Sequence, residues 1–269
     1  MFRNKKSEMG FLVTMLIILI AGLVIIIVIT QFTKKAGMEG AVDACRFSVM
    51  AQTASTIKVK NVVSVGSPLD IQCDTRYVTF KNTEVDAGLD PDSKQPMKVF
   101  YNNQQVTKFA NLNDYVVNQV LAEEMRVCFY QFGQGAVRIW SNQESMFKKN
   151  ACFICSDVTF DMKDKEYTGL LDFLDKTTIK SEGVTYQKYF DNAASNSFYS
   201  WSEIVKYNPD TYAKTYSNKH YLILFLKHYG VPNLLQLSPG DPFNGFENNY
   251  YVHIIYAEDI PKWCDMIAS

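Results

Sequence analysis

The hydrophobic and polar positions divide this chain into two unequal parts. Residues 9–33 contain no charged side chain, and their middle consists almost entirely of Leu, Ile and Val. As a helix, a run of this length matches the hydrocarbon core of a bilayer, which is about 30 Å thick. No comparable run follows, and the remaining pattern is mixed. The sequence therefore predicts one transmembrane helix at residues 9–33, which contacts the lipid bilayer, and a folded domain after it.

Helical periodicity recurs in four places after this run. Residues 34–55 are expected to prolong the anchor as a membrane-proximal helix, because apolar residues recur on one stripe. The clearest helix is predicted over about 114–132, with Gly133 ending it. Its polar positions are expected to include Glu123, Glu124 and Arg126. Shorter helices are predicted at residues 168–175 and 261–267.

Strand patterns alternate with these helices. Residues 69–74 alternate apolar and polar side chains, which predicts a half-buried strand with residues 57–65 as its candidate partner. Another strand is expected around 152–160. Residues 220–229 and 250–257 are apolar on both faces, which is typical of strands in the middle of a covered sheet.

Together these elements predict an α+β domain, residues 56–269, with a mostly antiparallel sheet. Its orientation follows from the charges that flank the anchor. Three basic residues precede the run and two follow it, which slightly favours a cytoplasmic N-terminus, residues 1–8, and a domain outside the cytoplasm. These basic residues are Arg3, Lys5, Lys6, Lys34 and Lys35.

The cysteines bear on the same question. All six lie after the anchor, at Cys45, Cys73, Cys128, Cys152, Cys155 and Cys264. An even number in one domain suits disulfides in an oxidising compartment, although buried free thiols in a cytoplasmic domain are the alternative.

The spacing of the cysteines limits their pairing. On an extended strand, Cys152 and Cys155 stand about 10 Å apart, which is too far for a disulfide between them. In that strand Ile154, Val158 and Phe160 are expected to share a face with Cys152. We expect Cys45 to pair with Cys73, Cys128 with either Cys152 or Cys155, and Cys264 with the other. Cys45, Cys73, Cys128 and Cys152 are expected to face the core together.

An aromatic segment at residues 179–219 differs from its surroundings, because it has few aliphatic residues. It is either an insertion that packs on the core or a contact surface, since Tyr and Trp are enriched at interfaces. In the second case the contact residues would be Tyr186, Tyr189, Tyr199, Trp201, Tyr207, Tyr212 and Tyr216.

Little in the sequence indicates chemistry. The charge is near neutral, with 27 basic and 28 acidic residues, so no nucleic-acid-binding footprint is present. We identify no catalytic residues, no cofactor motif and no metal-ligand set, and the three histidines fall in segments that look buried. We expect a non-enzymatic structural or interaction protein with a protein partner or self-association. A membrane-tethered thiol–disulfide protein based on Cys152 and Cys155 is a further alternative.

The N-terminus also resembles a type IV pilin leader. The basic start, a Gly10–Phe11 step and the apolar run that follows match that family, in which the leader is cut between the Gly and the Phe. The resemblance implies a filament subunit whose helix packs on a β-rich head. It departs from the family at Met15, where pilins carry a Glu.

The whole layout is similar to a group of single-pass archaeal surface proteins with an N-terminal anchor and a cysteine-containing extracytoplasmic domain. The likeness is carried by the basic start, the segment that begins at Cys45, a helix ending near Cys128 and the C-x-x-C segment at Cys152. It implies a place in the cell membrane and no particular activity.

Overall fold

The structure is a computed structural model that describes residues 37–55, 71–135, 151–193, 209–228 and 249–268. The chain divides after Ala41 into two units. Only the opening turn of one helix is described in the first unit, and all other described residues belong to the second. The predicted anchor and the predicted strand partner at residues 57–65 lie outside the described residues.

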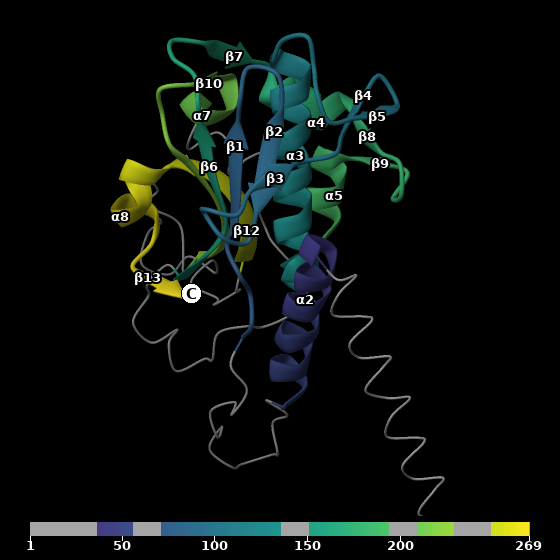
Figure 1. Cartoon of the computed structure of the whole chain (residues 1–269). Helices are drawn as coiled ribbons and strands as arrows, with labels where there is room; N and C mark the ends of the chain where they lie inside the picture. Colours follow the sequence, from purple (N-terminus) through teal and green to yellow (C-terminus); the bar gives the residue numbers. More distant parts are fainter. Residues whose placement is uncertain (1–36, 56–70, 136–150, 194–208, 229–248, 269) are drawn as a thin grey trace, which may run out of the picture. The chain divides into compact units, whose positions relative to one another are not determined.

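One large sheet organises the second unit (Figure 1). Its strands follow the order β12 (Asn249–Tyr256), β11 (Tyr221–His228), β6 (Ala151–Phe160), β1 (Arg76–Phe80), β2 (Val85–Gly88) and β3 (Gln95–Pro96). The C-terminal strand β13 (Met266–Ala268) also pairs with β6. β1 and β13 run parallel to β6, and all other neighbours in this sheet are antiparallel. The predicted α+β class with a mostly antiparallel sheet is confirmed.

Helices and small hairpins surround this sheet. The described helices are α2 (Gly37–Ser55), α3 (Asp114–Gln131), α4 (Leu170–Lys176), α5 (Tyr186–Ala193), α7 (Pro209–Ala213) and α8 (Ile260–Trp263). Short 3₁₀ turns occur at η1 (Gly133–Gly135) and η4 (Ala257–Asp259). Three two-stranded pairs complete the fold: β4 (Val99–Tyr101) with β5 (Gln104–Val106), β7 (Glu166–Thr168) with β10 (Lys214–Tyr216), and β8 (Thr178–Ile179) with β9 (Val184–Thr185).

Helix α3 confirms the clearest sequence prediction. The Asn113 side chain accepts a hydrogen bond from the Val116 N–H at 3.0 Å and caps the first turn. Gly133, at a φ of 63°, follows its last turn. The apolar stripe predicted from the sequence is almost fully buried, at Val117, Leu121, Met125, Cys128 and Phe132. This stripe packs α3 on the sheet, where the Phe132 and Phe225 rings stack at 4.5 Å.

The opposite face of the sheet is covered by the C-terminal segment. Its core contains Leu222, Leu224, Leu226 and Ile255 from β11 and β12, with Ile260 and Trp263 of α8 packed against them. Figure 1 shows α3 and α8 on the two sides of the sheet. This double cover explains why β11 and β12 are apolar on both faces. β11 is an inner strand as predicted, whereas β12 is the end strand of the described sheet.

A β-bulge in β6 changes which side chains share a face. The register with β11 pairs Ile154 with Leu224 and Ser156 with Ile223, so Cys155 has no opposite residue. Because of this extra residue, Cys155 and Ser156 both point towards α3. The expected common face of Cys152 with Val158 and Phe160 is therefore wrong, since alternation shifts by one residue at the bulge.

Two other predicted elements differ from the structure. Residues 71–75 form no strand, although Ile71 and Cys73 are less exposed than their neighbours as expected. The Gln72 N–H donates instead to Ser48 Oγ at 3.0 Å, because this segment is tied to α2 rather than to a strand. The predicted helix at 261–267 ends at Trp263, where Cys264 bonds to Cys152 and the chain turns into β13.

Candidate functional site

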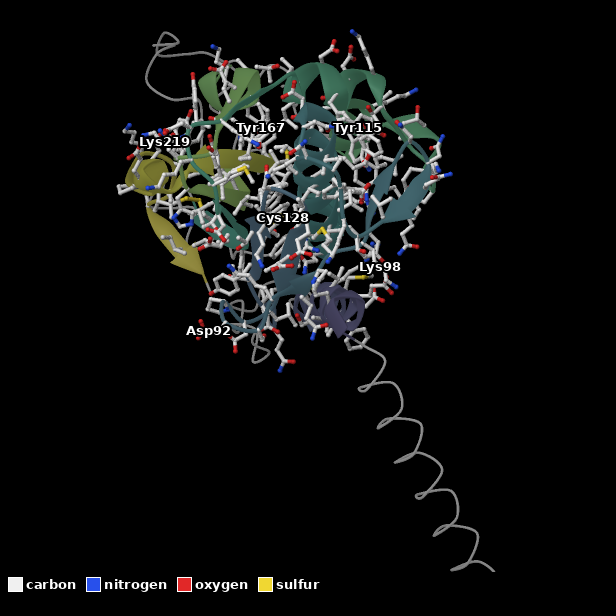
Figure 2. All side chains as sticks on the ribbon, turned by 45° about the horizontal axis from the view of Figure 1, so that its top comes forward. Asp92, Lys98, Tyr115, Cys128, Tyr167 and Lys219 are labelled. Atoms are coloured by element: carbon white, nitrogen blue, oxygen red, sulfur yellow. A yellow bond between two sulfur atoms is a disulfide. The ribbon has the colours of Figure 1, made fainter. Side chains whose placement is uncertain are left out.

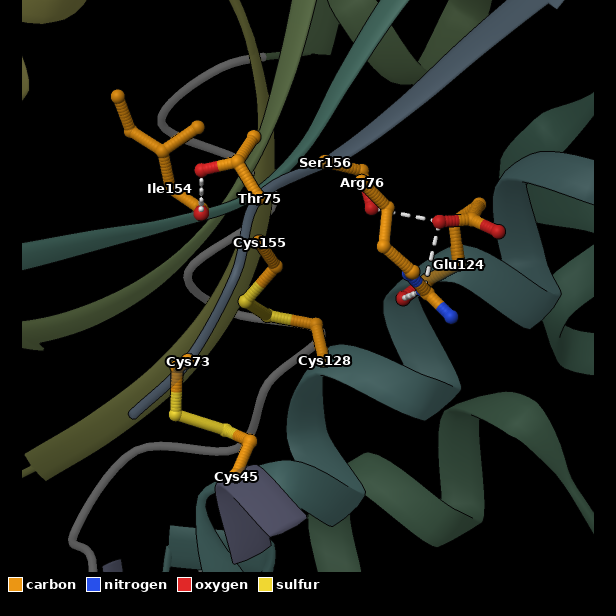
Figure 3. The surroundings of a disulfide bond; sticks show 9 residues. All are labelled: Cys45, Cys73, Thr75, Arg76, Glu124, Cys128, Ile154, Cys155 and Ser156. Carbon is orange, nitrogen blue, oxygen red and sulfur yellow. Dashed lines mark hydrogen bonds and ion pairs between the residues drawn. A yellow bond between two sulfur atoms is a disulfide. The ribbon is translucent and has the colours of Figure 1, made fainter. Parts of the chain in front are cut away.

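All six cysteines are joined in disulfides, which confirms the predicted Cys45–Cys73 bond and selects Cys155 of the two predicted alternatives as the partner of Cys128. The bonds are Cys45–Cys73, Cys128–Cys155 and Cys152–Cys264. The first joins α2 to the segment that leads into β1, and the second joins α3 to the bulge of β6 (Figure 3). Cys152 does not face the same side as Cys128, because it packs with Cys264 in the core beneath α8.

The C-x-x-C segment is not a redox pair in this structure. Cys152 and Cys155 are bonded to cysteines on opposite faces of the sheet, and neither bonds to the other. In a redox site of this spacing the two cysteines form a disulfide with each other, whereas here each is bonded to a distant cysteine. The spacing therefore reflects two structural bonds that leave one strand in opposite directions.

A buried ion pair lies next to the Cys128–Cys155 bond (Figure 3). The Arg76 Nη2 atom of β1 lies 2.6 Å from Glu124 Oε2 of α3, and Ser156 Oγ of β6 donates to the same oxygen at 2.5 Å. Arg76 is 5% exposed and Glu124 is 4% exposed. The prediction that Glu124 lies on the polar side of the helix is wrong, because its carboxylate faces the sheet rather than solvent.

Burial decides what this polar cluster can do. General acid–base chemistry requires a side chain within hydrogen-bond reach of a substrate. Ser156 is fully buried, and the Glu124 carboxylate is enclosed between α3 and two strands. The pair instead fixes the position of α3 on the sheet, because separating its charges would leave one of them buried without a partner.

The aromatic segment at 179–219 is largely a packing element where it is described. Tyr186, Tyr189 and Tyr212 are at most 5% exposed, which agrees with the first alternative, an insertion that packs on the core, and not with a contact surface at these three residues. Tyr216 is half-buried. Tyr199, Trp201 and Tyr207 lie outside the described residues.

Polar partners satisfy the buried hydroxyls of Tyr186 and Tyr212. The Tyr186 hydroxyl donates to Glu123 Oε1, and that carboxylate also pairs with Arg126 at 2.8 Å. The Tyr212 hydroxyl accepts from the Ile254 N–H of the end strand β12 at 3.3 Å. Burial raises the pKa of Tyr186 and of Tyr212 well above the usual tyrosine value, because the phenolate would lose its hydration.

An exposed face occurs instead on the β4–β5 hairpin. Phe100 is 50% exposed and stands directly opposite Gln105. Its neighbours in β4 point the other way, since Val99 is buried and Tyr101 packs edge-on against Tyr115 at 5.5 Å. The Lys180 ammonium, from the β8–β9 turn, lies 5.8 Å from the centre of the Phe100 ring.

We name this surface the hairpin face and define it as Lys98, Phe100, Gln105, Thr107 and Lys180. All five residues are exposed. Figure 2 shows Lys98 and Tyr115 on the side of the molecule where β4 and β5 lie. The signal that we missed in the sequence is the Asn102–Asn103 pair, whose φ angles of 47° and 65° form the tight turn. A hairpin with that turn places Phe100 and Tyr101 on opposite faces.

Helix α2 also exposes apolar side chains, at two positions. Its inner side holds Cys45 and Val49, both fully buried, and Arg46 lies 3.8 Å above the Tyr130 ring of α3. Its outer side exposes 75% of Phe47 and 50% of Met50. These two residues are one helical turn apart and form a small apolar stripe.

No helix in the described ranges is long and apolar enough to cross a bilayer, and residues 9–33 fall outside those ranges. No three His, Cys, Asp or Glu side chains within them gather closely enough to hold a metal ion. His220, at the start of β11, instead lies 2.7 Å from Asp157 and is exposed, whereas His253 is fully buried.

No protein-family model matches the chain, and no curated protein or solved structure is significantly similar to it.

Proposed function

We propose that this chain is a membrane-tethered protein whose disulfide-bonded α+β domain lies outside the cytoplasm and binds a partner without catalysing a reaction. The observation that carries this proposal is the pairing of all six cysteines in three disulfides. Disulfides of this density persist in oxidising compartments and are rare in the cytosol.

The sequence pattern supplies the tether. Residues 9–33 are apolar, uncharged and long enough for one transmembrane helix, and helix α2 begins only a few residues later. The basic residues on the N-terminal side favour the same orientation as the disulfides. The resemblance to anchored archaeal surface proteins agrees with this arrangement.

The hairpin face is the contact surface that we assign to this domain. Its aromatic ring is half exposed and lies among lysine and amide side chains, whereas the tyrosines first expected to bind are buried. Aromatic residues are enriched at binding surfaces. The enclosure of the Arg76–Glu124 pair and the bonding of Cys152 and Cys155 to separate partners support a binding role over chemistry at those sites.

The intact mass of the full chain from its native membrane tests this proposal. The protein is alkylated without reduction, by a reagent that does not cross the membrane, and then again after reduction. We expect an unshortened chain that takes no reagent until it is reduced and then takes six equivalents, one per cysteine. Reagent uptake without reduction only after the membrane is opened would place the domain in the cytoplasm and would overturn the proposal.

A pilin-like filament subunit is the second candidate. The exposed Phe47 and Met50 on α2 favour it, because a helix that follows an apolar run and keeps an apolar outer stripe suits packing against other copies. In that case the same mass measurement should show a chain shortened by residues 1–10, cut at the Gly10–Phe11 step.

A further inference from the structure

We propose that the hairpin face binds an acidic polysaccharide, a polymer of uronic-acid-type sugars. This inference rests on the proposed function, since it names the partner of the same surface. Three observations carry it: the charge of the face, its area and the type of polar group around its aromatic ring.

The charge of the face is positive. Residues 97–113 contain Lys98 and Lys108 and no Asp or Glu. Among the described residues, neither Lys98 nor Lys180 forms an ion pair, unlike Lys176, which pairs with Asp172. The acid nearest to Lys180 in the sequence is Glu182, in the same turn. A partner with negative groups at intervals would therefore be attracted and oriented on this face.

The apolar area is small for a protein partner. Phe100 is 50% exposed, which corresponds to ~100 Å² of aromatic surface. A stable protein–protein interface buries about 800 Å² on each partner, with several anchors at its centre. One ring with a narrow rim instead matches the footprint of a single sugar unit. A polymer can then gain affinity by repeated contacts along its length.

The polar side chains around the Phe100 ring also match the chemistry of a sugar. The electron-rich face of an aromatic ring attracts the C–H bonds of a pyranose, which carry partial positive charge. Sugar hydroxyls both donate and accept hydrogen bonds, and the amide of Gln105 and the hydroxyl of Thr107 offer both functions. Carboxylates of uronic acids would pair with Lys98 and Lys180.

The location leaves this face free of the segment that follows the predicted anchor. The hairpin contacts α3 at Tyr115, near its first turn, whereas α2 contacts it at Tyr130, near its last turn. These positions are 15 residues apart on one helix, which corresponds to ~22 Å along its axis. A long polymer therefore has room to cross the hairpin without meeting α2.

Binding of polygalacturonate to the full chain in neutral detergent micelles tests the inference by titration calorimetry. Neutral dextran and poly-glutamate serve as comparison polymers. We expect binding to polygalacturonate, no binding to dextran and at least tenfold weaker binding to poly-glutamate. The affinity for polygalacturonate should fall as ionic strength rises, because exposed charges are screened by salt.

Variants separate the aromatic contribution from the ionic one. Phe100→Ala should weaken polygalacturonate binding at least tenfold, whereas Phe47→Ala, which removes a more exposed ring from α2, should leave it unchanged. Lys98→Gln and Lys180→Gln should each weaken binding several-fold and reduce its salt dependence. Lys188→Gln on α5 is the matched control, and Glu182→Gln should strengthen binding. Unchanged melting temperatures show that each variant is folded.

Three results would overturn the inference. These are no binding to polygalacturonate, binding that Phe100→Ala leaves unchanged, and binding of poly-glutamate with equal or greater affinity. The last result would indicate an acidic polypeptide as partner. The alkylation experiment is independent of all three, so the proposed location and the proposed ligand can fail separately.

Discussion

At its C-terminal end, helix α3 is joined to the sheet by the Cys128–Cys155 disulfide and touches α2 through the Tyr130 ring. At its N-terminal end, Tyr115 is 37% exposed and neighbours a small hairpin with an open aromatic face. The C-terminal end of α3 is thus held by a covalent bond and by packing, whereas its N-terminal end lies beside an exposed surface. We therefore expect the effects of substitutions on stability to become smaller from the middle and end of α3 towards its beginning.

The strongest test of this comparison removes the charge from Glu124. Glu124→Gln leaves the Arg76 guanidinium buried without an anionic partner, so we expect the free energy of unfolding to fall by about 3–5 kcal/mol in urea denaturation. Asp172→Asn, which breaks an exposed pair with Lys176, should have no measurable effect. Equal effects of the two substitutions would show that the buried pair does not hold α3.

Removing the Cys128–Cys155 bond should come next. The double variant Cys128→Ser/Cys155→Ser opens a loop with a sequence separation of 27, and we expect a loss of about 3 kcal/mol. The Cys152→Ser/Cys264→Ser variant should lose about 1 kcal/mol more, because its separation is 112 and the cost of closing a loop grows with length. Urea titrations of both variants measure this difference. A smaller loss for the longer loop would contradict the entropic argument.

Alkaline pH should lower the free energy of unfolding through the buried tyrosines. The pKa of Tyr186, Tyr212 and Tyr221 is raised by burial in the folded chain, while the unfolded value stays near 10. Above pH 10 the unfolded state loses protons that the folded state keeps, so stability is intact below pH 10 and falls as pH rises further. The limit is about 1.4 kcal/mol per pH unit for each tyrosine. Melting temperatures between pH 9 and 12 should show this fall, with a gentler slope in Tyr212→Phe.

A smaller effect on stability is expected from the N-cap of α3, at the N-terminal end of the helix. Asn113→Ala removes the acceptor for the Val116 N–H, and we expect a loss of about 1 kcal/mol in the free energy of unfolding. Asn111→Ala, two residues earlier and also exposed, is the control and should change little. If both variants unfold alike, the cap contributes nothing to this end of the helix.

The smallest effect on stability is expected at the hairpin face. Phe100→Ala should change the free energy of unfolding by less than about 0.5 kcal/mol, because the ring is half exposed. Phe129→Ala, on the buried side of α3, should cost about 3–5 kcal/mol in the same denaturation assay. A large loss for Phe100→Ala would mean that the ring is needed for folding and would remove the contrast between the two ends.

Local patterns were sufficient to predict α3, β6 and β11 and to exclude a bond between Cys152 and Cys155, but the choice between these two as the partner of Cys128 stayed open. Each depends on periodicity or on a distance along one strand, which a sequence shows directly. The position of Glu124 was not predictable in this way. Its partner, Arg76, lies 48 residues earlier and meets it only after β1 pairs with β6. A charged residue in a helix faces solvent by default, and only tertiary contact overrides this.

For a related reason, the sequence left open whether the 179–219 segment packs on the core or forms a contact surface. Aromatic residues are frequent in the 179–219 segment, but composition does not show which rings the rest of the fold covers. Tyr186 and Tyr189 are buried because α5 packs against α3, where the Tyr189 ring meets Phe129. Phe100 is exposed because its strand is one of only two in its sheet and so has an outer face without a covering layer. The one-residue shift at Cys155 likewise has no signature in the alternation.

The Cys45–Cys73 bond has a mechanical consequence for a tethered domain. A pull that enters through α2 passes at Cys45 across the disulfide to Cys73 and reaches β1 three residues later, at Arg76. Residues 46–72 form a closed covalent loop on this route and carry no tension. The second half of α2 and its contact with Tyr130 are thus shielded from any drag on the domain. The load instead enters β1, which transmits it as shear to its parallel neighbour β6.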